Sequence, residues 1–339
     1  MKRFICFLSL LLMGVLGTLT AMARDADRFL IVVGEKSGYI NRKGEVAIAP
    51  QFDAASDFRE GLAAVSSGGK WGYIDPKGKY VISPMFDFAN AFSEGMAPVM
   101  IDSKFGYVDK SGRRSISLQY DFGGGFCEGL AAVTLNGRIG YINHDGDQVI
   151  PFQFEEAGCF SEGFAPVQIN QKWGFINRAG ALVISSQYDK AFWFAQGLAP
   201  VRLGWKWGYI DPTGRMVIAP QFEYASSHLE GLAAVKTDGR YGFIDTAGKM
   251  VIAPKYESVQ FFSEGLAAVK VNSKWGFIDK KGKFVLAPQF DSGDFFRNGL
   301  VDVVKGDGGG YIDHTGRFVW EEQKVNAKVA NPQRMKRHP

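Results

Sequence analysis

Short apolar runs alternate with turn-forming residues along the whole chain, a pattern that is typical of β-strands rather than helices. Residues 61–94 illustrate it: three apolar runs follow one another, each bounded by Gly, Asp or Lys, before an irregular connector in which Phe86 and Phe92 are the anchoring aromatic residues. The pattern predicts three strands in this stretch, at residues 61–65, 70–75 and 79–83.

The pattern recurs every 34 residues, without an insertion, in nine copies. Three glycine columns keep this spacing, and a period of this length in which glycines stay in step indicates a tandem repeat. Gly, Asp and β-branched residues fill positions where paired helices would need Ala, Leu and Glu, so the repeats are predicted to be β units. The first glycine column comprises Gly38, Gly72, Gly106, Gly140, Gly174, Gly208, Gly242, Gly276 and Gly310.

A turn of constant composition joins the second and third predicted strands of each copy. In the copy above it opens on Asp75 and reaches Gly78 three residues later. An Asx side chain can accept a hydrogen bond from the backbone two residues on, and Gly adopts the positive φ that such a turn requires. We therefore interpret this Asp or Asn column as turn-forming and not as a row of catalytic acids.

Each predicted sheet is apolar on both faces. The alternation of side chains places Trp71 opposite Ile82 and Tyr73 opposite Tyr80 on one face, with Ile74 on the other. A sheet of this kind must be covered on both sides, and the neighbouring copy is the obvious cover, with sheets stacked about 10 Å apart.

Two arrangements satisfy this constraint: a β-propeller, or an open superhelix. The first copy begins with a strand at residues 29–33 and the last ends with one at 318–320, so no strand is left over to be exchanged between the ends. Propeller blades generally have four strands. We therefore predict an all-β fold of nine tandem three-stranded repeats stacked as an open superhelical, solenoid-like array, with a β-propeller as the alternative.

The most regular motif has a strong family resemblance. The chain reads KWGYID at Lys70 and Lys206, KWGFIN at Lys172 and KWGFID at Lys274, each with EGLAAV-like and VIAPQF-like segments. These motifs resemble the bacterial WG-repeat family over residues 28–320. The resemblance implies a secreted or envelope-associated β-repeat protein that acts as an interaction scaffold, and it supplies no catalytic residue or ligand.

The first 23 residues have the composition of a secretory signal. Lys2 and Arg3 precede an apolar run at residues 4–16, and small residues follow up to Ala21-Met22-Ala23. We expect cleavage after Ala23 and export to the periplasm, the cell surface or the medium. An uncleaved membrane anchor is the alternative, because the apolar run approaches spanning length. No other stretch of the sequence could span a bilayer.

These features divide the chain into a signal peptide at residues 1–23, the array of nine repeats at 24–322 and a basic tail at 323–339 that we expect to be disordered. The net charge is +4, but Lys2 and Arg3 belong to the signal, and the segment from Glu321 onward holds five bases and two acids. The remaining body therefore carries −1. A body of this charge argues against a nucleic-acid partner.

Only Cys127 and Cys159 remain once the signal is removed. They could pair in an oxidising compartment, where closing the loop would contribute ~3–4 kcal/mol. Two isolated thiols are the equal alternative, because two cysteines make no framework. They have no neighbouring His and are too few for a zinc site.

Three charged columns run through the copies: a base before the Trp position, an acid before the second Gly, and an acid after the connector aromatic. We expect these bases and acids to neutralise one another or to bond turns. The four histidines, His144, His228, His314 and His338, form no nucleophile–base motif with a candidate Ser or Cys and have no metal-ligand spacing. Every copy carries similar carboxylates, whereas a retaining or inverting glycosidase needs one unlike pair. We expect no catalytic residue, metal or cofactor.

Aromatic residues that break the repeat are the remaining candidates for function. Phe192 and Trp193 replace small or polar connector residues, Trp205 replaces Gly or Ser, and Phe261 and Phe295 recur at the Trp193 position. Exposed rings would suit a partner surface, and the alternative is local core packing. We predict a non-catalytic extracytoplasmic scaffold for protein–protein interaction that binds an envelope protein through these residues. A carbohydrate- or cell-wall-binding module, with a glycan as its ligand, is the alternative.

Overall fold

The computed structural model describes residues 27–322, which form nine consecutive antiparallel sheets. Eight of the sheets have four strands and the first has three. The all-β prediction and the nine tandem repeats are confirmed. The described residues fall into two compact units, residues 85–255 and residues 27–84 with 256–322, which are described separately below.

The first unit contains the last two residues of β7 (Tyr80–Phe86), the strands β8 to β26, and all but the last residue of β27. They are β8 Phe88–Ala89, β9 Met96–Ile101, β10 Lys104–Asp109, β11 Arg114–Tyr120, β12 Phe122–Cys127, β13 Leu130–Leu135, β14 Arg138–Ile142, β15 Gln148–Phe154, β16 Glu156–Ala157, β17 Phe164–Ile169, β18 Lys172–Asn177, β19 Leu182–Tyr188, β20 Lys190–Ala191, β21 Ala199–Leu203, β22 Lys206–Ile210, β23 Met216–Phe222, β24 Tyr224–Ala225, β25 Ala233–Thr237, β26 Arg240–Ile244 and β27 Met250–Tyr256.

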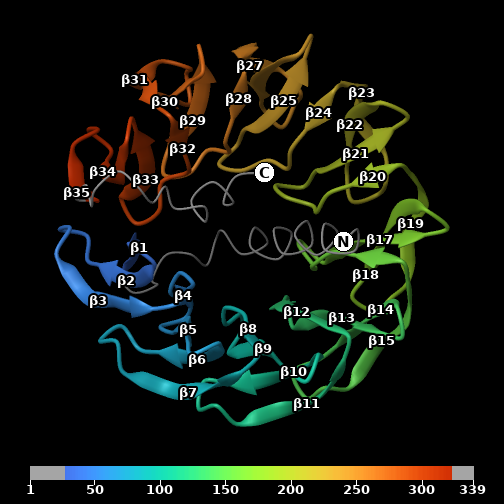
Figure 1. The fold of residues 1–339 in the computed structure, drawn as a ribbon. Coiled ribbons are helices and arrows are strands. Elements are labelled where there is room, and N and C mark those ends of the chain that lie inside the picture. Colours follow the sequence, from blue (N-terminus) through green and yellow to red (C-terminus); the bar gives the residue numbers. More distant parts are fainter. Residues whose placement is uncertain (1–26, 323–339) are drawn as a thin grey trace. The chain divides into compact units, whose positions relative to one another are not determined.

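The second unit contains the strands at both ends of the array. They are β1 Phe29–Val33, β2 Lys36–Ile40, β3 Val46–Phe52, β4 Ala54–Ala55, β5 Ala63–Ser67, β6 Lys70–Ile74, β7 Tyr80–Phe86, β28 Ser258–Val259, β29 Leu266–Val271, β30 Lys274–Asp279, β31 Phe284–Phe290, β32 Ser292–Gly293, β33 Leu300–Lys305, β34 Gly308–Asp313 and β35 Phe318–Glu321. Within each sheet of either unit, neighbouring strands lie side by side in sequence order (Figure 1).

The fourth strand of each sheet corrects the three-stranded prediction. It is a two-residue segment of the connector in most copies, such as β20, where Lys190 pairs with Arg202 and Ala191 with Val201 of β21. Two residues are too few to produce a period-2 pattern in a sequence. The sequence pattern therefore does not predict this strand, and the connector that contains it reads as irregular.

The predicted register between the second and third strands of a copy is also wrong. It would place Trp207 opposite Ile218, but the structure places Trp207 opposite Phe222 and Tyr209 opposite Ile218, with register shifts on either side of Tyr209. The recurrent glycine allows this approach: a Cβ on Gly208 would lie 2.4 Å from the carbonyl oxygen of Ile218. No side chain fits there, so the glycine is required by close backbone packing.

The Asx turns are confirmed. In the turn that follows β10, Asp109 Oδ1 accepts hydrogen bonds from the Ser111 hydroxyl at 2.6 Å, the Ser111 amide at 2.9 Å and the Arg113 amide at 3.1 Å. Gly112 closes the turn with φ +86°. The Ser111 hydroxyl is the largest of the contacts that lower the pKa of Asp109 to about 2. The carboxylate is thus committed to holding the turn.

In the first unit, each sheet is covered by its neighbour, as predicted. One buried cluster joins Trp173 and Phe175 of β18 to Phe194 in the next connector and Val201 of β21. The hydroxyl of a strand tyrosine reinforces such contacts by donating to the next connector, as Tyr141 does to the carbonyl oxygen of Gly158 at 2.7 Å.

In the second unit, the first copy packs against the last. A buried cluster contains Phe29 and Ile31 of β1 with Leu300 and Tyr311 of the ninth sheet, and β1–β2 and β34–β35 lie next to one another (Figure 1). The Phe29 and Tyr311 ring centroids are 5.4 Å apart, and the Tyr311 hydroxyl donates to the carbonyl oxygen of Leu30 at 2.8 Å. This contact favours the β-propeller over the open superhelix. The ends meet by side-chain packing, so no exchanged strand is needed.

A glycine substitution tests this contact between the two ends of the array. A Cβ on Gly44 would lie 2.0 Å from the carbonyl oxygen of Val319, whereas on Gly78 it would meet only the Ile48 side chain, at 3.1 Å. Both glycines have φ +82°, so alanine is strained equally at either position. We expect Gly44→Ala to lower the free energy of unfolding by about 2 kcal/mol more than Gly78→Ala, as judged by urea denaturation. Equal losses would mean that the first and last copies do not pack in solution.

One connector carries a histidine where the others carry phenylalanine. His228 is fully buried beside Tyr209, with ring centroids 5.0 Å apart. Its Nε2 lies 3.2 Å from the carbonyl oxygen of Asp245, and its Nδ1 has no hydrogen-bond partner. Burial lowers the pKa of His228, and the Asp245 contacts oppose this shift only in part. The fold therefore accommodates neutral histidine better than the charged form.

We expect His228→Phe to stabilise the protein, increasingly so at acidic pH. The pKa of His228 is lower in the folded state than its unfolded value near 6.5, so unfolding takes up a proton as the pH falls below that value. The wild type should lose stability between pH 7 and pH 5, while the phenylalanine variant does not share this loss. Melting temperatures of both proteins across that range would test this. A difference that stays constant with pH would contradict it.

Candidate functional site

The base and second acid columns form a regular set of ion pairs across the described residues. Lys172 Nζ lies 2.5 Å from Asp189 Oδ1, and Asp189 Oδ2 accepts a hydrogen bond from the Gly204 amide at 2.6 Å. The Lys172 contact is the main cause of the lowered pKa of Asp189. Asp189 thus joins a base to a hairpin tip, which supports the structural interpretation of these columns. Equivalent pairs are Lys36–Asp53, Lys104–Asp121, Arg138–Glu155 and Lys274–Asp291.

The acid column before the second glycine links one copy to the next. Glu94 has φ +53° and Gly95 φ +82°, which makes a two-residue turn between Ser93 and Met96. Its carboxylate accepts a hydrogen bond from the Gly129 amide of the following copy at 2.9 Å. The same bond recurs at Glu128–Gly163, Glu162–Gly197, Gln196–Gly231 and Glu264–Gly299. These carboxylates, and the amide oxygen of Gln196, therefore have a structural role.

The histidines of the described segment pack against the connectors. His144 stacks on Phe126 with ring centroids 4.1 Å apart, and His314 stacks on Phe296 at 4.3 Å. Their Nε2 atoms lie near Glu94 and Glu264. Between residues 27 and 322, no group of three or more His, Cys, Asp and Glu is placed to hold a metal ion. His338 lies outside the described residues.

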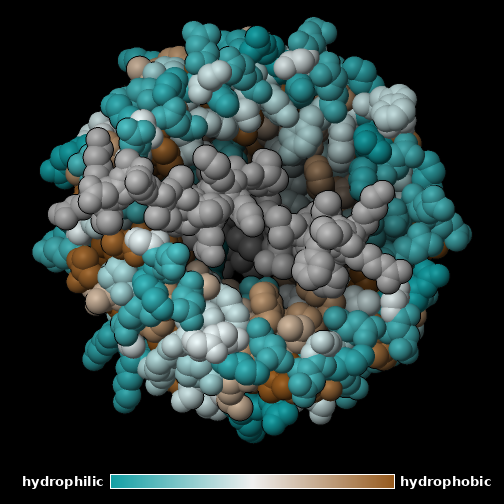
Figure 2. All heavy atoms as spheres, viewed as in Figure 1, coloured by the Kyte–Doolittle hydropathy of each residue, from teal (hydrophilic) through white to brown (hydrophobic). Residues whose placement is uncertain are grey.

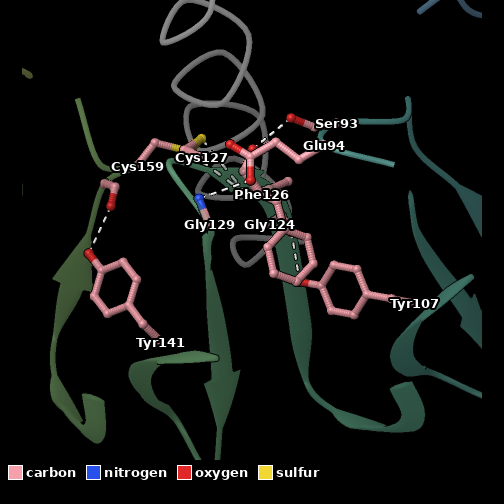
Figure 3. The surroundings of a disulfide bond; sticks show 11 residues. Ser93, Glu94, Tyr107, Gly124, Phe126, Cys127, Gly129, Tyr141 and Cys159 are labelled. Atoms are coloured by element: carbon pink, nitrogen blue, oxygen red, sulfur yellow. Dashed lines mark hydrogen bonds between the residues drawn. A yellow bond between two sulfur atoms is a disulfide. The ribbon is translucent and has the colours of Figure 1, made fainter. Parts of the chain in front are cut away.

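The connector position after the buried aromatic is a second point of linkage between copies. Ser161 Oγ donates to the carbonyl oxygen of Phe194 in the next connector at 2.8 Å. Cys127 occupies the equivalent position and forms a disulfide with Cys159 of the next connector, with Cα atoms 5.7 Å apart. Figure 3 shows the disulfide close to the Glu94–Gly129 hydrogen bond. Of the two alternatives for the cysteines, the structure has the pair.

Of the candidate aromatics of the first unit, Phe192 and Trp193 remain neighbours, with ring centroids 5.9 Å apart, and Trp205 lies apart from Phe192. Phe192 stacks on Trp207, with centroids 4.9 Å apart and planes inclined by 15°, and packs against a core cluster. Trp193 is half-buried, and its carbonyl oxygen accepts a hydrogen bond from Ser227 Oγ at 2.9 Å. Trp205 is 86% exposed at the tip of the β21–β22 hairpin. The Phe192 amide donates a hydrogen bond to the carbonyl oxygen of Pro200, near the start of β21, whereas Trp205 follows the end of β21. Phe192 and Trp205 therefore lie at different ends of this strand.

The candidate aromatics of the second unit come together. Phe261 and Phe295 are half-buried, with ring centroids 4.3 Å apart. Arg297 lies over the Phe295 ring at 4.7 Å and forms an ion pair with Asp57 at 2.6 Å, although 240 residues separate the two charges. Asp57 is the main cause that raises the pKa of Arg297. We call Asp57, Phe261, Phe295 and Arg297 the connector cluster.

Sequence reasoning missed Arg297 and Asp57. Arg297 occupies the position of Ser161 and Cys127, the linking position, and Asp57 occupies the position of Trp193. A basic residue at a position that otherwise forms links between copies was the available signal. Its partner could not be found without knowing that the two ends of the array meet.

Comparison with solved structures supports the fold. The chain is similar to a structure described as "Crystal structure of the eukaryotic initiation factor", at 12% identity and a TM-score of 0.64, over 88% of this chain and 96% of that one. It also aligns with the dihydro-heme d1 dehydrogenase NirN, at 14% identity and a TM-score of 0.47, over 87% of this chain and 73% of the other. Only the first of these likenesses supports the fold, and neither indicates a function. A search of the curated proteins finds no relative of this chain.

A family profile, the WG containing repeat, matches eight consecutive segments. They are residues 38–71, 71–105, 105–138, 139–173, 173–206, 207–241, 241–275 and 275–308. The segments cover most of the chain and follow one another at the period of the repeat. The chain therefore belongs to the WG-repeat family.

Proposed function

We propose that this protein is a non-catalytic scaffold for protein–protein interaction in the cell envelope and that the connector cluster binds its partner. One observation carries the proposal: two rings and an arginine remain partly exposed together at a position where the repeat usually has small side chains. Aromatic residues and arginine are the types that dominate binding energy at protein interfaces. The stacked pair and the ion pair hold these side chains in place, which lowers the entropic cost of binding.

The engagement of the other polar residues supports a non-catalytic role. Asp109 holds a turn, Asp189 joins Lys172 to a hairpin tip, and Glu94 joins two copies. A catalytic acid or base must instead be free to exchange a proton with a substrate. The carboxylates that recur in the copies are thus poor candidates for an active site.

Two features support an exported protein. Residues 1–23 have the composition of a secretory signal, although they lie outside the described residues. The Cys127–Cys159 disulfide belongs to the described part, and such bonds persist in oxidising compartments. Among residues 27–322, no helix has the length and apolar character needed to cross a membrane.

A matched pair of variants tests the partner site. The wild-type protein is immobilised on a column and captures its partner from envelope extract. We expect the double variant Phe261→Ser with Phe295→Ser to bind this partner at least tenfold more weakly. Phe284→Ser is the control, because Phe284 is a 38% exposed phenylalanine of the same unit on the outer strand β31. Partners are identified by mass spectrometry and affinities are measured with the purified partner.

The outcomes of this experiment are distinct. Selective loss in the double variant, with an unchanged melting temperature, supports the proposal. Equal binding by all three proteins would contradict it. Retention of glycan or cell-wall material alone would instead favour the carbohydrate-binding alternative.

The proposed location is tested by the state of the cysteines. In protein recovered from the envelope or the medium, denaturation without reductant should leave Cys127 and Cys159 unreactive to a maleimide, because both are in the disulfide. Reduction should expose both thiols and lower the stability by about 3 kcal/mol. Full labelling before reduction would show that the protein resides in a reducing compartment.

A further inference from the structure

The β21–β22 hairpin ends in an unusually exposed tryptophan. Trp205 is 86% exposed, and Leu203 on the same tip is 39% exposed. The visible face of the molecule is mainly hydrophilic, with apolar residues in small separate groups (Figure 2). An indole that is almost fully exposed to water buries almost no apolar surface and does not contribute to the core of this protein. The tip therefore differs from Phe192, which packs against Trp207.

The turn itself is built to carry a bulky residue. In the preceding copy both central residues of the tip, Asn170 and Gln171, have positive φ, at 50° and 62°. In this copy Gly204 takes the positive φ, at 60°, and Trp205 does not. Glycine at the first central position gives a type II′ turn, in which the second residue is unstrained. The change of turn presents Trp205 without backbone strain.

Three bases surround the tip. Lys190 lies opposite Arg202 across β20 and β21, and Lys206 lies opposite Leu203. Lys190 and Lys206 are exposed and form no ion pair within residues 27–322. Arg202 is half-buried, and its Nε has no hydrogen-bond partner. No other copy has a base at all three positions.

The nearby acids are already engaged. Asp189 contacts Lys172 through one oxygen and the Gly204 amide through the other. Glu223 occupies the position of Asp189 in the next copy, where it could pair with Lys206. Its carboxylate instead accepts a hydrogen bond from the Gly239 amide at 3.2 Å. The tip thus combines an exposed indole and leucine with the unpaired positive charges of Lys190 and Lys206, while Arg202 interacts with Asp189. It offers no free carboxylate to receive sugar hydroxyl groups.

We propose that this hairpin tip anchors the protein to the surface of an anionic lipid bilayer. Tryptophan favours the headgroup region because its ring is apolar and its N–H is polar. Basic side chains close behind the ring can reach lipid phosphates while their stems cover apolar surface. A projecting tip suits an extended surface, whereas a soluble ligand is usually held in a concave site. This site shares no residue with the connector cluster, so the two proposals stand or fall independently.

Vesicle sedimentation tests the anchor. We expect the wild type to bind vesicles of phosphatidylglycerol and phosphatidylcholine, and Trp205→Ser to bind about tenfold more weakly. Replacing Lys190 and Lys206 by Gln should weaken binding roughly fivefold per base on these vesicles, and hardly at all on pure phosphatidylcholine. Every variant keeps the same N-terminal segment and basic tail, so differences report on the tip. Unchanged melting temperatures confirm that the variants are folded.

A transplanted tryptophan separates the ring from its charged surroundings. Asp307 sits at the second central position of a similar turn, after Gly306 with φ +60°, but Ser292, Val304 and Gly308 stand at the positions of the three bases. Asp307→Trp should therefore not restore binding to the Trp205→Ser variant. Full restoration would show that any exposed indole suffices and would overturn the proposal.

Fluorescence locates the ring directly. Brominated lipids in the vesicles should quench the tryptophan emission of the wild type. Trp205→Phe should bind with similar strength and lose most of this quenching, because the other six tryptophans remain away from the lipid. Equal vesicle binding by wild type and Trp205→Ser would refute the anchor. So would a Trp205-dependent affinity for a soluble polyanion such as heparin that exceeds the affinity for vesicles.

Discussion

The stacking of one sheet on the next is the constraint on which the rest of this structure depends. The second strand of each copy is buried along nearly its whole length, as in β22 with four consecutive buried residues, so neither face of the sheet can be left to solvent. Three kinds of contact hold neighbours together: the tyrosine hydroxyl bonds of Tyr141 and its equivalents, the Glu94–Gly129 type of bond, and the clusters between sheets. Since no copy is complete alone, the end copies face the same problem, and the contact of Phe29 with Tyr311 solves it.

The same constraint determines where function can lie. Charged residues that recur in the copies are used to join strands, turns and neighbours, as Asp189 and Glu94 show. Residues that depart from the repeat do not take part in these recurring bonds of the charged columns. At the linking position of the connectors, a serine, a cysteine or an arginine makes the link by a hydrogen bond, a disulfide or an ion pair. At the hairpin tips, a change of turn type brings a tryptophan to the surface.

Local features of this fold could be predicted from the sequence, and contacts at long range could not. The Asx turn at Asp109 depends on residues within four positions, and its signature is visible in the sequence. The short strand β20 was missed because two residues show no periodicity, and the register of Trp207 was misplaced because a bulge is invisible in an alternating pattern. The packing of the first copy on the last is only the alternative prediction from the sequence, because no strand is left over to be exchanged between the ends. Arg297 could be paired with Asp57 only after that packing was known.

The contact between the two ends is the central claim, and a zero-length cross-link tests it most directly. Arg297→Lys would place an amine near Asp57, which contacts residue 297 at 2.6 Å in the wild type. Treatment of the dilute monomer with a carbodiimide should then yield an amide between positions 57 and 297 within one chain, identified by mass spectrometry of the joined peptides. This product is expected if the first and last copies pack together. Its absence from the monomer, or its appearance only in dimers, would show that the array is open.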